Sequence, residues 1–80
     1  MTRHDLPDMV VEALTAMGGA GRIVQICKYI WEHHKDALSR SGDLFYTWQY
    51  DVRWAGQYLR DSGMLEKSRS DHVWRLREQK

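Results

Sequence analysis

A row of polar and aromatic residues in the second half of the chain has the side chains needed to read base edges. The row recurs at three- and four-residue steps, so on a helix it would share one side; it comprises Gln49, Tyr50, Arg53, Gln57 and Arg60, with Trp54 at its border. Arginine reaches guanine O6 and N7, and glutamine pairs with adenine N6 and N7. We therefore expect a helix that presents these residues to the major groove of duplex DNA.

Basic residues gather near the C-terminus although the formal net charge of the whole chain is only +1. The stretch from residue 67 to residue 77 contains one acidic residue, Asp71, and four basic residues: Lys67, Arg69, Arg75 and Arg77. Lys67, Arg69 and Arg75 could follow the phosphate backbone, which would make binding sensitive to salt. The other interpretation is an ordinary charged strand edge that prevents aggregation.

Two aromatic residues of the row are open to more than one interpretation. Tyr50 and Trp54 could cover a thymine methyl or an N6-methyl group on adenine, because such groups offer apolar contact area. Trp54 could instead lean onto the C-terminal strands and complete the core. Exposed aromatic side chains, among them Tyr29 and Tyr46, would also suit a protein–protein interface.

Other kinds of chemistry find little support in the residue pattern. Cys27 falls on an apolar helical stripe, and the adjacent His33 and His34 cannot both face one ion from a regular helix. The aspartates show no pairing suited to acid–base work, and the chain has no nucleophile motif. We expect no metal, no cofactor and no enzymatic activity, with Cys27 as a small apolar core residue.

Apolar spacing predicts three helices that would position these residues. The first spans Leu6–Met17, with Pro7 in its first turn and Gly18-Gly19 at its end. A short connector, Ala20–Arg22, leads to a second helix from Ile23 to about His34. From Lys35 to Asp43 the expectation is a frayed helix end followed by a loop.

The third predicted helix carries the polar row. Thr47 would be its N-cap, and Gly63 would end it in a left-handed conformation. Its core-facing stripe comprises Trp48, Val52, Ala55 and Leu59.

Two short strands are expected after the third helix. They are Met64–Lys67 and Val73–Leu76, joined by the polar turn Ser68–His72. Trp74 and Leu76 share a strand face and would cover the third helix. The expected fold is α+β: three helices followed by a two-stranded β-hairpin.

Length and composition indicate one ordered domain over residues 1–80. The hydrophobic fraction is 42%, enough for a core, and eighty residues close only one. A lone cysteine, no signal-peptide pattern and no long apolar run predict a soluble, cytoplasmic protein without a membrane segment.

Three stretches resemble the winged helix-turn-helix family, in which such a hairpin forms the wing. They contain a Trp-Ala pair, a leucine, a helix-ending glycine and a closing Trp-x-Leu, and they are Asp51–Ala55, Leu59–Leu65 and Val73–Leu76. They are similar to the N-terminal winged helices of Mrr-type restriction proteins and, more loosely, to the reader domains of methyladenine-dependent restriction endonucleases.

The resemblance implies binding of duplex DNA, including DNA that contains N6-methyladenine. It further implies a targeting module of a restriction system, whose nuclease domain would lie outside this chain. The alternative is a winged helix for protein interaction or dimerisation that does not bind DNA, because a fold alone does not determine function.

Overall fold

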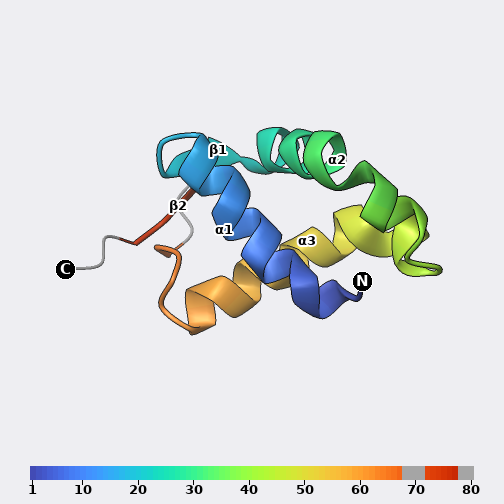
Figure 1. Ribbon diagram of the computed structural model, residues 1–80. Coiled ribbons are helices and arrows are strands. Elements are labelled where there is room, and N and C mark those ends of the chain that lie inside the picture. Colours follow the sequence, from blue (N-terminus) through green and yellow to red (C-terminus); the bar gives the residue numbers. More distant parts are fainter. Residues whose placement is uncertain (68–71, 78–80) are drawn as a thin grey trace.

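The computed structural model describes residues 1–67 and 72–77 and places three helices beside a small antiparallel sheet (Figure 1). The elements are the 3-10 turn η1 (Arg3–Asp5), α1 (Leu6–Ala16), β1 (Ala20–Arg22), α2 (Ile23–Ser39), α3 (Leu44–Asp61) and β2 (Val73–Arg75). The expected α+β class is confirmed, and the layout is compatible with a winged helix. The order of elements differs from the prediction, because one strand precedes α2.

The first helix begins and ends as its sequence predicts. Pro7 lies in the first turn of α1, where a missing N–H costs no hydrogen bond. Gly18 and Gly19 follow the helix at φ values of 82° and 101°, and the Gly19 N–H donates to the carbonyl of Leu14 at 2.7 Å. Glycine adopts this left-handed region at no steric cost, so the chain turns sharply there.

The second helix is longer than predicted, because α2 continues as a helix to Ser39 where a frayed end was expected from Lys35. α2 continues to Ser39 through a kink at His34, whose φ and ψ are −126° and 19°. After the kink, Leu38 is fully buried. The kink breaks the regular apolar spacing, which is why the pattern stopped at His34.

The third helix begins at Leu44, four residues before the start that an N-cap at Thr47 implies, so Thr47 is not its N-cap. The Thr47 hydroxyl instead donates to the Asp51 carboxylate at 2.9 Å, one turn further along α3. Leu44 is buried and extends the core stripe by one turn, which stabilises the earlier start. Gly63 has the expected positive φ of 84° just beyond the helix.

The sheet pairs different segments from those predicted. β2 is antiparallel to β1, with Ala20 opposite Arg75 and Arg22 opposite Val73, whereas Ala20–Arg22 was expected to be a connector. The segment predicted as the partner strand forms only a bridge, Leu65 to Leu76, supported by the Glu66 N–H donating to the Arg75 carbonyl at 2.9 Å. A three-residue strand is too short to show alternation, so β1 left no signal. Most of the predicted turn lies outside the described residues.

The core lies where the three helices meet. The predicted stripe on α3 is buried as expected, and fully buried residues from α1 and α2 pack against it; these include Leu6, Val10, Leu14, Ile26 and Ile30. Trp74 covers α3 as predicted, because its ring lies over Gly56, where an added Cβ would be 2.5 Å from Trp74 Cη2.

Candidate nucleic-acid interface

The outer face of α3 brings together the central residues of the predicted row. Burial of one stripe of the helix leaves the opposite side in solvent, where Gln49, Tyr50, Arg53 and Gln57 are all exposed. Tyr50 has 77% of its surface exposed. We call these four residues the outer face of α3.

The Asp61 carboxylate lies at the Gln57 end of the outer face and makes that end less suited to an anionic ligand. The Gln57 side-chain amide donates to Asp61 Oδ1 at 2.9 Å, which occupies one of its donors. A negative charge at this end repels phosphate, because two like charges at short range disfavour contact. The half of the outer face around Gln49 and Arg53 is therefore the better place for an anionic ligand.

Trp54 is half-buried, unlike the four exposed residues of the outer face. The Arg3 guanidinium sits 4.7 Å from the centre of its ring, and the His4 ring meets it edge-on at 5.5 Å. Tyr58 packs beside it at 5.7 Å. Trp54 thus packs against η1; it neither leans onto the sheet nor extends the outer face.

The predicted basic residues are divided between several places. The Arg60 guanidinium stacks over the Trp74 ring at 5.0 Å, and its buried Nε finds no acceptor among the described residues. Arg75 is half-buried within β2, and Lys67 is exposed after the Leu65 bridge. Arg69 lies outside the described residues. The structure thus holds the Arg60 side chain against Trp74 of the sheet.

A groove between α2 and α3 was not predicted from the sequence. One hollow of about 420 Å³ is lined by Ile23, Val24, Cys27, Lys28, Trp31, Trp48, Gln49 and Arg53. A second hollow, of about 410 Å³, shares three of these residues and is lined by Trp31, Phe45, Tyr46, Trp48 and Gln49. We call the two together the α2/α3 groove. It adjoins the outer face of α3 through Gln49 and Arg53.

The α2/α3 groove carries positive charge from both helices. Lys28 belongs to α2 and Arg53 to α3, and no aspartate or glutamate appears among the described residues lining either hollow. Burial raises the pKa of the Cys27 thiol, while the positive charge of Arg53 acts in the opposite direction. The Arg53 guanidinium is therefore close enough to Cys27 for its charge to act on the thiol.

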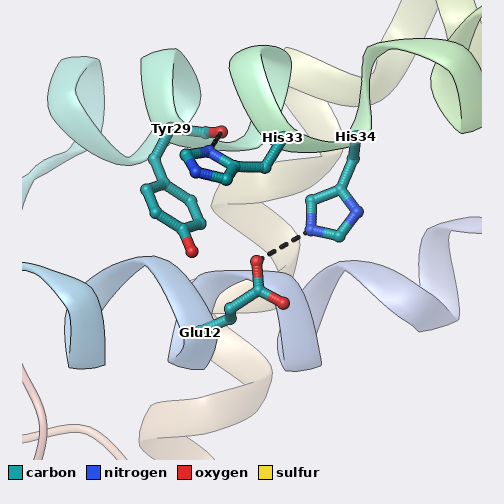
Figure 2. A network of polar contacts seen from close by, with 4 residues as sticks. All are labelled: Glu12, Tyr29, His33 and His34. Atoms are coloured by element: carbon teal, nitrogen blue, oxygen red, sulfur yellow. Dashed lines mark hydrogen bonds and ion pairs between the residues drawn. The ribbon is translucent and has the colours of Figure 1, made fainter.

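A separate polar network joins α1 to α2 (Figure 2). Glu12 Oε2 of α1 lies 2.9 Å from Nε2 of His34, at the kink in α2. His33 lies beside this pair; its ring stacks on Tyr29 at 3.9 Å, and its Nδ1 is 3.0 Å from the Tyr29 carbonyl oxygen. The hydrogen bond from His34 lowers the pKa of the Glu12 carboxyl. These contacts tie the two helices together.

Within residues 1–67 and 72–77, no three histidine, cysteine, aspartate or glutamate side chains converge where a metal ion could be held. None of the helices in that part of the chain combines the length and the apolar character needed to cross a membrane.

Comparison with known proteins offers no relative from which a role could be transferred: no family model, no curated protein and no solved structure matches the chain.

Proposed function

We propose that the chain is a winged-helix module that binds duplex DNA with α3 in the major groove. The observation that carries this proposal is the outer face of α3, which is exposed along a helix of 18 residues. Such a helix is about 27 Å long at 1.5 Å per residue. The major groove of B-DNA is about 12 Å wide and accepts an α-helix. The outer face then meets base edges while the buried stripe stays in the core.

The side chains of the outer face divide the work of recognition. Arg53 is exposed and has the two parallel donors that match guanine O6 and N7. Gln49 is the better partner for adenine, because the Gln57 amide already donates to Asp61. Lys28 and Lys67 are exposed and supply the phosphate contacts.

A titration of labelled duplex DNA, followed by fluorescence anisotropy over a range of salt concentrations, tests this proposal. Arg53→Ala should weaken binding by about 1–3 kcal/mol, the scale of one bidentate base contact. Arg40→Ala is the matched control, because it removes the same charge from an exposed position at the end of α2. Equal loss in both variants, or no binding by the unmodified chain, would contradict the proposal.

Preference for adenine-methylated DNA is a second proposal, favoured by the exposure of Tyr50 beside Gln49. A methyl group in the groove gives the Tyr50 ring an apolar partner, while glutamine pairs with the remaining N6 hydrogen. The methylated duplex should bind more tightly by about 1–3 kcal/mol, the scale of one base contact. A module of this kind would direct a nuclease domain, supplied elsewhere, to modified DNA.

Competition between methylated and unmethylated duplexes tests the preference. Tyr50→Ala should erase it while leaving affinity for unmodified DNA nearly unchanged. Tyr58→Ala is the control, because Tyr58 is also a solvent-exposed tyrosine of α3 but packs beside Trp54. Trp54→Ala should not affect the preference, since Trp54 packs against Arg3 and His4. Equal affinity for both duplexes would refute methyl reading and leave general DNA binding intact.

A further inference from the structure

The α2/α3 groove has an apolar wall that the core does not use. Val24, in the first turn of α2, is 75% exposed although it is a large aliphatic residue. Phe45, in the first turn of α3, is 37% exposed and lines the neighbouring hollow. Exposed apolar residues gathered along one groove are typical of a surface that another molecule covers.

The two tryptophan rings of the groove are already engaged through their faces. Trp31 and Trp48 stack nearly parallel, with ring centres 6.2 Å apart, and the ammonium of Lys35 lies over Trp31 at 5.6 Å. Phe45 meets Tyr46 edge-on at 5.1 Å. The hollow beside Val24 and the two tryptophans therefore suits inserted apolar side chains better than a stacked nucleobase.

Charge specifies the occupant further. Lys28 and Arg53 stand on the two walls of the groove, and its described lining contains no carboxylate. The nearest acids of α2, Glu32 and Asp36, line another hollow together with His33 and His34. A ligand that combines apolar side chains with negative charge is complementary to this surface.

We infer that the α2/α3 groove binds an acidic amphipathic peptide segment of a partner protein. Its apolar side chains fill the space beside Val24 and Trp31, and its carboxylates face Lys28 and Arg53. This is the helix-in-groove form of peptide recognition. The inference goes beyond DNA binding and does not depend on it. Because Gln49 and Arg53 belong both to the groove and to the outer face of α3, peptide and DNA would compete.

Synthetic peptides of about 15 residues, long enough to form a helix, test the inference with the full chain. The first has leucine and tryptophan on one face and glutamate on the other. In the second, lysine replaces glutamate; in the third, alanine replaces leucine and tryptophan. Isothermal titration should show binding of the first peptide and at least about tenfold weaker binding of the others. Equal binding of the lysine peptide would overturn the inference.

A groove variant locates the binding site. Val24→Asp places a carboxylate in the groove, and because Val24 is mostly exposed, unfolding in urea should change little. Affinity for the acidic peptide should fall about tenfold or more. Ala37→Asp is the matched control, because it adds the same charge at an exposed position of α2 outside the groove. Equal effects of the two variants would overturn the inference.

Cys27 supplies an independent readout, because it lines the groove and is half-buried. A bound acidic peptide should slow alkylation of its thiol. If a single-stranded thymidine oligonucleotide protects Cys27 and the acidic peptide does not, the groove is a nucleic-acid site and the inference is wrong. If duplex DNA fails to bind while the peptide binds and is sensitive to Val24→Asp, the proposed function fails and this inference stands.

Discussion

The two flanks of α2 face their neighbours in opposite ways. Toward α1, side chains cross the gap: Glu12 reaches His34 at 2.9 Å, and the stacked rings of Tyr29 and His33 lie beside this pair (Figure 2). Toward α3, a groove lies between the two helices, and Lys28 and Arg53 are among the residues that line it. The first flank uses its polar groups to hold the fold, whereas the second leaves polar and apolar groups available to a ligand.

Substitution of a core residue should give the largest effect on the free energy of unfolding. Leu59→Ala removes a buried side chain from α3 and should lower the free energy of unfolding by about 2–5 kcal/mol, which could unfold so small a domain. Tyr58→Ala changes the neighbouring residue, which is half exposed, and should cost less than about 1 kcal/mol. Urea denaturation followed by circular dichroism measures both. A Leu59→Ala midpoint equal to that of the unchanged chain would mean that the core-facing side of α3 is misplaced.

The contact between Gly56 and Trp74 should give the next largest effect. In Gly56→Ala the new Cβ would meet the Trp74 ring, so the ring must move off α3. Overpacking of this kind costs about 1–3 kcal/mol, less about 1 kcal/mol gained from the better helix propensity of alanine. The same change in a Trp74→Leu background should lose this cost. An unchanged cost there would show that the ring is not the cause.

The flank of α2 that faces α1 predicts a small, pH-dependent effect on the free energy of unfolding. The His34 hydrogen bond lowers the pKa of Glu12 below its usual value of 4.5, so the pair stabilises the fold above that value and loses its effect as pH falls below it. Glu12→Gln should therefore cost less than about 1 kcal/mol near neutral pH, since the pair is partly exposed, and the cost should shrink in acid. Urea midpoints measured between about pH 7 and pH 3 show this. Glu32→Gln, on the outside of α2, should not reproduce the trend.

The flank of α2 that faces α3 predicts the smallest effect, a change in the pKa of the Cys27 thiol. Arg53 offsets part of the rise that burial causes in the pKa of Cys27, so Arg53→Ala should raise that pKa further. The rate of alkylation measured against pH should move toward higher pH. Arg40→Ala should leave the profile where it was. No movement in Arg53→Ala would place the guanidinium away from the groove.

Helical spacing predicted the parts of the fold that depend on regular burial. The stripe from Trp48 to Leu59 is buried, and the exposure of Gln49, Tyr50 and Arg53 follows from it. Features that depart from regular helical spacing were not predicted. The kink at His34 interrupts the spacing in α2, and the real start of α3 at Leu44 lies before the capping residue that the pattern favoured.

Features that depend on how elements meet in space were not predicted. Trp54 shares the spacing of the polar row, yet it packs on Arg3 and His4 because η1 lies beside that side of α3. The α2/α3 groove needs the relative placement of two helices, which spacing within either helix does not contain. β1 has only three residues, and its partner lies near the opposite end of the described chain.

The pairing of β1 with β2 has a consequence for the order of folding. The two strands are separated along the chain by the whole of α2 and α3, so their pairing closes a loop that contains both helices (Figure 1). Closing so long a loop has an entropic cost before any strand contact offsets it. The helices should therefore assemble first and the sheet last, with Trp74 settling over Gly56 in the final step. Tryptophan fluorescence should accordingly contain a late phase that is absent from circular dichroism of the helices.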